Sequence, residues 1–463
     1  MTKETSFFEA CHLIAEDIQE TVDTFPIHLF SHFDADGLAA ASILASTFFQ
    51  EGFNFQLRIL ERLEYVTLNS IMKKVPQGSS VIFTDIGTGL IDGFQQWKDS
   101  HKIFVLDHHS LPLDLDLSED IRHLNPHNHS INGATELSGA GVAYFVSIQI
   151  NSQNKYLSPL ALIGALGDRQ DQGEYSSLIG LNKTIVEDAK KLELVSDDVS
   201  VWFYDRTRTL ISVLRQADYL GFENELEIRA FLERLEIPFR TEKGLRTFYE
   251  LNEEENRRLA SELILYCDVD PSEIYKRDYC LINEELEFLR DARVFVTKLN
   301  ACGKTQRSDV GISLCLGDRH TALRDLQIIE DEYSKMIAQG LNWALTEGYL
   351  KELTGIYFLD GRKSINERII GTIVSVLSSR KNQSQKPVLG CALTTTGRIK
   401  VSMRVSRYLN KQIDLSQILN QVIDRVEPDS EVGGHAAAAG AIISEISLED
   451  FVSQVNQLAL EGR

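Results

Sequence analysis

The feature that most limits the fold of this 463-residue chain is the alternation of short apolar runs with helical segments near its N-terminus. The apolar runs are short and rich in residues that favour strands, and the segments between them have helical periodicity. The predicted strands cover 27–32, 54–60, 81–84 and 103–106, and the predicted helices between them cover 38–50 and 66–74. Alternating strands and helices build a mostly parallel sheet that is covered on both faces, so we predict an α/β fold.

The first predicted strand leads into the sequence Ser-His-Phe-Asp-Ala-Asp-Gly at 31–37. If the extended geometry persisted, His32, Asp34 and Asp36 would project to one side of the strand. Such groups repel and desolvate one another unless a cation binds between them, which indicates a cation site. The alternative interpretation is an acidic turn that is simply exposed to water. A calcium loop fits badly, because its twelfth position would fall on Ala45 where a glutamate is needed.

Three more acidic positions follow apolar segments. Asp85 ends the third predicted strand, Asp107-His108-His109 ends the fourth, and Asp168 follows an apolar helix predicted over 157–166. Ligands of parallel sheets bind beyond the carboxyl ends of the strands, so we expect these side chains to meet at one edge.

Such a set suits the hydrolysis of phosphodiesters by two divalent cations. Two ions about 3.5–4 Å apart activate a water molecule and neutralise the charge that develops on the phosphoryl and leaving oxygens. Carboxylates are hard ligands, and imidazole admits a transition metal such as Mn²⁺. The candidate ligands are Asp34, Asp36, Asp85, His108 and Asp168, with His32 as a further candidate. No Gly-rich phosphate loop and no Gly-x-Ser-x-Gly motif occurs, which argues against a nucleotide-driven motor and a serine esterase.

Composition narrows the class of protein. The formal net charge of −21 argues against a protein that coats nucleic acid through its overall field, but it leaves room for a local basic groove. Six widely spaced cysteines without a Cys-x-x-Cys pair suit reduced thiols in the cytoplasm. His123, His127 and His129 lack cysteine partners, so surface histidines are favoured over a zinc site. We expect no signal peptide, no transmembrane helix and no membrane partner.

The length of the chain favours two or three domains. We predict a metal-binding domain over 1–184, a helical insertion over 185–278 and a smaller α/β domain over 279–463. The insertion is rich in charged residues, and it is either a surface for a protein partner or a plain structural addition. Elements of the last domain are expected as strands at 294–296, 311–316, 355–359, 387–394, 398–404 and 440–443, and as helices at 321–349, 367–379 and from 447.

Three stretches are candidates for binding the substrate. The first is a basic run without acidic residues, which predicts a phosphate-binding face or a merely solvated edge. Its members are Arg380, Lys381, Lys386, Arg398, Lys400, Arg404, Arg407 and Lys411. The second, Gly433-Gly434-His435, allows the backbone to approach a ligand or makes a tight turn. The third, Ser138-Gly139, opens a helix whose N–H groups would favour an anion, unless Ser138 is only a cap.

In order along the chain, these motifs resemble those of the DHH phosphoesterase superfamily. The motifs are His32-x-Asp34-x-Asp36-Gly37, Asp85, Asp107-His108-His109, Gly167-Asp168 and Gly433-Gly434-His435. Val401-Ser402-Met403-Arg404 and Leu299-Asn300-Ala301-Cys302-Gly303 resemble elements of the associated C-terminal domain. Within the superfamily the chain is most similar to archaeal RecJ-like nucleases, including the GINS-associated nuclease.

The resemblance implies a role for each motif residue. One ion would be held by Asp34 and the candidate His32, the other by Asp36, His108 and Asp168, and Asp85 would bridge the two. His109 would face the scissile phosphate, and Asp107 would orient a neighbouring imidazole. Ser402, Arg404 and Gly433-Gly434-His435 would bind the substrate backbone across a cleft between the domains.

The resemblance also implies an activity. We expect an exonuclease that depends on two Mn²⁺ or Mg²⁺ ions and removes nucleotides from single-stranded DNA or RNA, from the 5′ end, in DNA replication or repair. One alternative is a phosphodiesterase acting on oligoribonucleotides or cyclic dinucleotides. The other is a replisome scaffold that binds the GINS complex through 185–278, with nuclease activity secondary.

Overall fold

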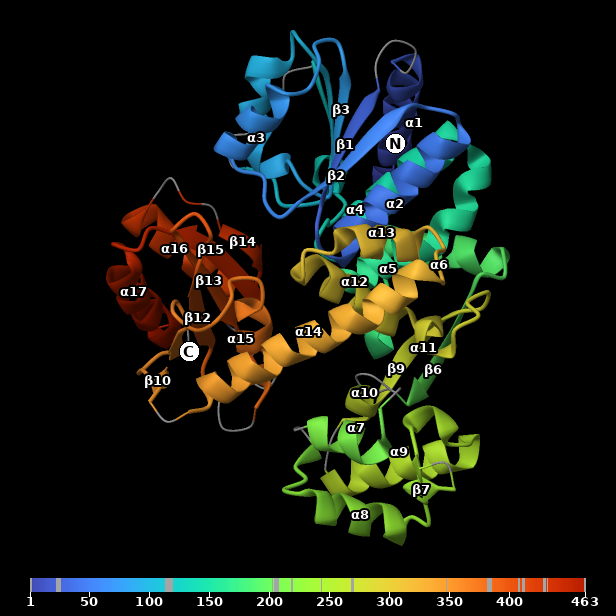
Figure 1. Ribbon diagram of the computed structural model, residues 1–463, viewed down its shortest axis with the longest axis vertical. Helices are drawn as coiled ribbons and strands as arrows, with labels where there is room; N and C mark the ends of the chain where they lie inside the picture. Colours follow the sequence, from blue (N-terminus) through green and yellow to red (C-terminus); the bar gives the residue numbers. More distant parts are fainter. Residues whose placement is uncertain are drawn as a thin grey trace. The chain divides into compact units, whose positions relative to one another are not determined.

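The chain forms two compact units in a computed structural model (Figure 1). The first unit comprises Met1–Thr207 and Asn256–Glu330, and the second comprises Arg208–Glu255 and Asp331–Arg463. The structure describes residues 2–21, 26–112, 120–201, 203, 208–217, 220–242, 244–267, 270–346, 348–380, 385–406, 409, 413–427, 430 and 432–461. None of the helices in these ranges is both long enough and apolar enough to cross a lipid bilayer.

A five-stranded parallel sheet forms the centre of the first unit. Its strand order is β2-β1-β3-β4-β5, and each neighbouring pair is parallel. The strands are β1 (Ile27–His32), β2 (Phe55–Leu60), β3 (Ser80–Thr84), β4 (Lys102–Leu106) and β5 (Ile121–Leu124). The predicted α/β fold with a parallel sheet is confirmed, although β5 was not anticipated.

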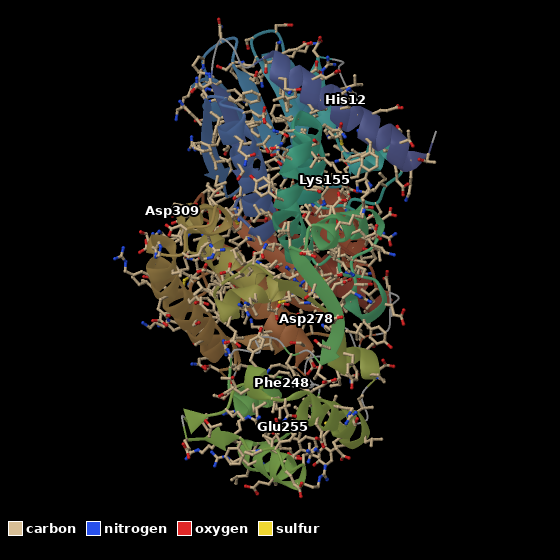
Figure 2. All side chains as sticks on the ribbon, turned by 90° about the vertical axis from the view of Figure 1, so that its right-hand side faces the viewer. His12, Lys155, Phe248, Glu255, Asp278 and Asp309 are labelled. Carbon is tan, nitrogen blue, oxygen red and sulfur yellow. The ribbon has the colours of Figure 1, made fainter. Side chains whose placement is uncertain are left out.

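Both faces of this sheet are covered, because neighbouring residues of each strand point to opposite sides. Leu29 packs into a core with the helices α1 (Lys3–Glu20), α2 (Ala35–Gln50), α4 (Gly139–Ile150) and α5 (Ser158–Gly167). Phe30 packs on the other side, with α3 (Tyr65–Met72) and the 3-10 segment η1 (Thr88–Trp97). The outer face of α1 carries exposed polar groups such as His12 (Figure 2).

Helix α2 begins earlier than predicted. Strand β1 ends at His32, and the side chain of Asp34 accepts a hydrogen bond from the Gly37 N–H as the N-cap of a helix that starts at Ala35. The condition under which His32, Asp34 and Asp36 would share one side of a strand is therefore not met. Asp36 lies in the first turn of α2, so it points in a direction that strand periodicity does not give.

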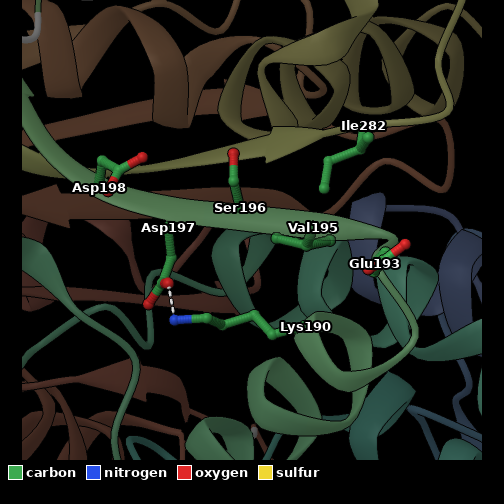
Figure 3. A pocket seen from close by; sticks show the side chains of 7 residues that line it. All are labelled: Lys190, Glu193, Val195, Ser196, Asp197, Asp198 and Ile282. Atoms are coloured by element: carbon green, nitrogen blue, oxygen red, sulfur yellow. Dashed lines mark ion pairs between the residues drawn. The ribbon is translucent and has the colours of Figure 1, made fainter.

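The region after α6 (Gly180–Lys191) contains strands as well as helices. Strand β6 (Val195–Val201) pairs antiparallel with β9 (Tyr275–Leu281), so the expected loss of strands over 185–278 is wrong in part. The predicted boundaries at 184 and 278 fall inside α6 and β9. Beside this ribbon lies a hollow of about 480 Å³, where Lys190 points toward Asp197 and pairs with it (Figure 3).

Two predicted strands of the C-terminal domain are helices of the first unit. Residues 294–296 lie in α12 (Ala292–Lys304), and 311–316 overlap α13 (Ser308–Cys315). Asp291 caps α12 by accepting hydrogen bonds from the N–H groups of Arg293 and Val294. Because α12 is buried around most of its circumference, its apolar run lacks the one-sided pattern that distinguishes a helix from a buried strand.

The second unit contains a six-stranded sheet of order β10-β11-β12-β13-β15-β14, in which only β11 and β12 are parallel. The strands are β10 (Leu350–Glu352), β11 (Tyr357–Asp360), β12 (Val388–Leu393), β13 (Ile399–Arg404), β14 (Val432–His435) and β15 (Ala438–Ile443). One face packs against α16 (Leu415–Val426) and α17 (Leu448–Glu461), and the other against α15 (Ile370–Ser379) and the end of α14 (Thr321–Ala344). The predicted second α/β sheet is confirmed, and the cleft between the domains stays a prediction.

The same unit includes the segment 208–255, which is mostly helical. It contains α7 (Leu210–Gln216), α8 (Glu225–Arg234) and the short strands β7 (Arg240–Thr241) and β8 (Gly244–Leu245), and it runs into α9 (Glu253–Cys267). Thr209 and Thr247 face each other in an isolated antiparallel bridge, so this part of the chain leaves and returns at neighbouring positions.

Candidate metal centre

Acidic and histidine side chains meet at the carboxyl ends of β1, β3 and β4 in the first unit, together with the end of α5. They form two triads and an overlapping set of four, Asp85, Asp107, His108 and His109, and in each group the ligand atoms lie within 4.8 Å of one another. One triad is His32, Asp34 and Asp85, and the other is Asp36, His108 and Asp168. The structure thus brings together all six side chains that the sequence indicated as metal ligands.

The first triad is centred on the imidazole of His32. Its Nδ1 lies 3.0 Å from Asp34 Oδ2 and 3.7 Å from Asp85 Oδ2. Burial alone would raise the pKa of Asp34, but His32 and the Gly37 N–H hold it below its ordinary value. The Asp34 carboxylate is therefore ionised and available to coordinate a cation.

Asp85 shows that the site fits a cation. Its backbone is left-handed, with φ 56°, and its Oδ1 is buried and receives no hydrogen bond from any described residue. A Cβ on Gly139 would lie 2.5 Å from that oxygen, so only glycine leaves it room. Burial, with Asp36 and Asp34 nearby, raises the pKa of Asp85 well above its ordinary value. Asp85 Oδ1 lies 3.2 Å from His108 Nε2 but accepts no well-aligned hydrogen bond, and such a buried carboxylate oxygen is costly alone and favourable beside a metal ion.

The second triad is organised by backbone groups. Asp36 accepts hydrogen bonds from the N–H groups of Gly139 (2.8 Å) and Ala140 (2.9 Å) at the start of α4. His108 Nδ1 donates to the Gly133 carbonyl at 2.7 Å, which leaves Nε2 to face the carboxylates. Nε2 lies 3.6 Å from Asp36 Oδ2 and 3.8 Å from Asp168 Oδ2.

Electrostatics in the second triad also favour a cation. Burial works to lower the pKa of His108, but Asp168 and Asp36 raise it to about 9. Burial raises the pKa of Asp36, with a further contribution from Asp168. In the absence of a metal ion, protons on these side chains compensate the negative charge of the triad. A divalent ion bound between the same carboxylates would take over that role.

The Asp107–His109 pair lies beside the triads. Asp107 Oδ1 accepts a hydrogen bond from His109 Nδ1 at 2.7 Å, and its Oδ2 accepts one from the Thr88 N–H at 2.9 Å. Burial would lower the pKa of His109, but Asp107 raises it to about 9. The His109 side chain is 51% exposed, so a protonated imidazole in a fixed orientation faces solvent next to the metal-binding groups.

At the predicted anion site, Ser138 and Gly139 form hydrogen bonds within the protein. The Ser138 side chain caps α4 by accepting a hydrogen bond from the Gly141 N–H, and the Gly139 N–H donates to Asp36. These residues therefore support the second triad, and the cap interpretation of Ser138 agrees with the hydrogen bonds.

The remaining substrate-binding candidates lie in the second unit. Ser402 is buried in β13, and Arg404 Nη1 donates to Ser402 Oγ at 3.2 Å and to the Met403 carbonyl at 2.8 Å. Gly434 has φ 115°, a conformation that favours glycine, and a Cβ there would overlap the Ala438 carbonyl oxygen. The side chain of His435 lies outside the described residues.

Two cations of the basic run pair with neighbouring groups of the second unit. Arg398 donates to Glu427, Ser430 and the Ile442 carbonyl, and Lys386 donates to Glu352. These two cations therefore have structural partners. Lys381, Arg407 and Lys411 lie outside the described residues.

Sequence reasoning missed several residues that support the centre. Gln170 is fully buried and donates to Asp168, and Asn300 Oδ1 accepts a hydrogen bond from the Ala35 N–H at 3.3 Å. Residues 299–303, which the resemblance assigned to the C-terminal domain, lie instead in α12 of the first unit. There a Cβ on Gly303 would overlap the Phe33 carbonyl oxygen. His123, expected at the surface, is half-buried, and burial lowers its pKa to about 4.

The parallel sheet and the acidic centre at its edge define an α/β protein with a site that could bind metal ions. Two family models match the chain: "DHH family, N-terminal domain" matches residues 26–167, and "DHHA1 domain" matches residues 354–461. The chain belongs to the DHH superfamily, whose members are phosphoesterases.

Two curated relatives are similar along most of the chain. The uncharacterized protein MJ0831 of Methanocaldococcus jannaschii is 29% identical over 440 residues, which cover 93% of each chain. The single-stranded-DNA-specific exonuclease RecJ of Haemophilus influenzae is 23% identical over 452 residues, which cover 93% of this chain and 65% of that protein. The chain thus spans less than two thirds of the length of that exonuclease.

Solved structures share the fold. RecJ from Thermus thermophilus in complex with Mn²⁺ has a TM-score of 0.60 at 15% identity, covering 98% of this chain and 55% of that one. CDC45 from Entamoeba histolytica has a TM-score of 0.63 at 12% identity, covering 97% of this chain and 99% of that one. The fold is therefore RecJ-like.

Proposed function

We propose that this chain is an exonuclease that hydrolyses phosphodiester bonds of single-stranded DNA or RNA, starting at the 5′ end, in DNA replication or repair. The observation that carries the proposal is the pair of triads with His109 beside them, held by Asp107. The similarity to RecJ, which is named as a single-stranded-DNA-specific exonuclease, supports the substrate class.

The two triads are the proposed ligands of two Mn²⁺ or Mg²⁺ ions. His32, Asp34 and Asp85 would hold one ion, and Asp36, His108 and Asp168 the other, with Asp85 between them. When bound, such ions supply an activated water molecule and neutralise charge on the phosphoryl group. The protein supplies a buried carboxylate, that of Asp36, which two backbone N–H groups already orient, so little reorganisation of this side chain is needed on binding.

His109 is the proposed contact to the phosphate. Its pairing with Asp107 keeps the imidazole protonated near neutral pH and fixes its orientation. A cationic donor at this position would stabilise the negative charge on a non-bridging oxygen. Ser402, Arg404 and the Gly433-Gly434 turn are the proposed contacts to the nucleic-acid backbone.

The test uses single-stranded DNA and RNA labelled at either end, and separately dinucleotides, with Mn²⁺ or with EDTA. We expect labelled mononucleotides to appear first from the 5′-labelled strand, and only with the metal ion. His109→Gln should abolish release, whereas His12→Gln should not, because His12 is exposed on α1 away from the ligands. Cleavage of dinucleotides alone would overturn the exonuclease in favour of an oligonucleotide phosphodiesterase.

A second candidate function is a scaffold in the replisome, bound to GINS through the helical segment. The similarity of the fold to CDC45 favours it. The segment can be removed by replacing 210–246 with a short Gly-Ser turn between Thr209 and Thr247, which already face each other. The scaffold would be favoured over the nuclease if the wild type binds purified GINS and cleaves no nucleic acid, and if the shortened variant no longer binds GINS.

A further inference from the structure

A buried side-chain amide links two ligands of one triad. Gln170 Nε2 donates to Asp168 Oδ2 at 3.0 Å and to the Gly133 carbonyl at 2.7 Å. The same carbonyl accepts the hydrogen bond from His108 Nδ1 at 2.7 Å. Gln170 therefore fixes the carboxylate of Asp168 directly and the imidazole of His108 through a shared acceptor.

A second amide fixes the first. Asn182 Nδ2, near the start of α6, donates to Gln170 Oε1 at 2.6 Å, which decides that the Nε2 of Gln170 points toward the triad. The backbone N–H of Asn182 donates to the Glu136 carbonyl at 2.9 Å. The Glu136 carboxylate accepts a hydrogen bond from the Asn132 N–H and so closes the turn that contains Gly133, whose carbonyl is the shared acceptor. Gln170 is 0% exposed and Asn182 is 1% exposed, so water does not compete for these bonds.

The other triad has no such support. Within the described parts of the chain, no side-chain amide bonds to His32, Asp34 or Asp85, and Asp85 Oδ1 accepts no well-aligned hydrogen bond, although His108 Nε2 lies 3.2 Å away. In the triad of His32, Asp34 and Asp85 the side chains are 24%, 36% and 2% exposed, and in the triad of Asp36, His108 and Asp168 they are 2%, 3% and 25% exposed. The two triads therefore differ in rigidity and in access to water.

We infer that Gln170 and Asn182 are positioning residues that make Asp36–His108–Asp168 the tighter of two metal sites. The inference rests on the metal-dependent function proposed above. Removing a group that is hydrogen-bonded to a metal ligand and fixes its orientation typically weakens metal binding by about 10- to 100-fold. The more exposed triad of His32, Asp34 and Asp85 then binds its ion more weakly and exchanges it faster.

The test is a titration of the metal-free full chain with Mn²⁺, in which the signal of free Mn²⁺ is followed by electron paramagnetic resonance. We expect two classes of site in the wild-type protein. Gln170→Met should weaken the tighter class by about 10- to 100-fold and leave the weaker class unchanged. Asn182→Leu should act in the same direction with a smaller loss. Gln172→Met is the matched control, because the side chain of that glutamine is exposed and donates a hydrogen bond to the Arg169 carbonyl, away from the triads.

The outcomes separate positioning from general damage. Unfolding by urea in EDTA shows whether each variant is folded, and Asn182→Leu keeps the test valid if Gln170→Met does not fold. Unchanged binding in both variants would overturn the inference, as would an equal loss at both classes. Because no substrate is present, a protein that binds Mn²⁺ as expected but cleaves nothing would refute the proposed function and leave this inference standing.

Discussion

Replacing Asp85 by asparagine should make the metal-free protein more stable and the metal-loaded protein less stable. The ligand oxygens of Asp85 and Asp34 lie within 4.8 Å of each other. Two unit charges at that distance repel by about 3.5 kcal/mol at an effective dielectric constant of about 20. Attraction to a protonated His108, whose Nε2 lies 3.2 Å from Asp85 Oδ1, is about 5 kcal/mol on the same basis, so the repulsion by Asp34 alone does not decide the sign. Burial, Asp36 and Asp34 together raise the pKa of Asp85, which means that the folded protein disfavours its charged form. We therefore expect a net gain of about 1–2 kcal/mol in EDTA, or about 2–8 °C in Tm.

In the presence of metal ions, the wild type should be more stable than Asp85→Asn. Saturating one site at about 100 times its Kd stabilises the folded state by about 2.7 kcal/mol, and the variant lacks the carboxylate proposed to join both sites. The assay is thermal unfolding of the wild type and Asp85→Asn in EDTA and in Mn²⁺, with the exposed Asp198→Asn as the control. An Asp85→Asn protein that is less stable in EDTA, or that gains as much from Mn²⁺ as the wild type, would refute the reasoning.

The difference in EDTA should also depend on pH. Burial, with Asp36 and Asp34, raises the pKa of Asp85 in the folded state, so the folded protein binds more protons than the unfolded one above about pH 4. The stability of the metal-free wild type therefore falls as the pH rises through that window. Below the unfolded pKa both states are protonated, and the advantage of Asp85→Asn should disappear.

Three further predictions concern neighbouring parts of the molecule. Gly303→Ala should lower stability by about 1–3 kcal/mol and weaken Mn²⁺ binding, because its Cβ would displace Phe33 between two ligands; calorimetric titration with unchanged affinity would contradict this. Asp107→Asn should lower kcat by about 10- to 100-fold through the loss of a charged hydrogen bond to His109, and activity within about twofold of the wild type would exclude that role. Arg404→Ala should weaken binding of single strands and reduce the salt slope by about 0.7, measured by fluorescence anisotropy, whereas an unchanged slope would remove Arg404 from the interface.

The sequence alone was enough to predict the parallel sheet and the six side chains that meet at its edge. Both depend on local signals, because short apolar runs mark strands and the carboxyl ends of parallel strands meet at one edge. Asp85 and His108 could be placed together for this reason, although they are far apart in the chain. How the six ligands divide into triads follows instead from the helical turn at Asp36, which strand periodicity did not predict.

Other features could not be predicted because no local pattern marks them. Helix α12 is buried on nearly all sides, so its apolar run resembles a strand. The pairing of β6 with β9 joins segments that are distant in sequence, and their charged residues gave no strand signal. Gln170 and Asn182 are ordinary polar residues in the sequence, and only their burial and hydrogen bonds distinguish them.

The ribbon of β6 and β9 has a consequence for how proteins of this kind can diversify. Val201 at the end of β6 pairs with Tyr275 at the start of β9, so everything between them departs and returns at adjacent points of the first unit. The entropy of closing such a loop grows only logarithmically with its length. A lineage can therefore lengthen, shorten or exchange this segment at little thermodynamic cost, and evolve new associations while the acidic and histidine side chains at the edge of the first sheet stay unchanged.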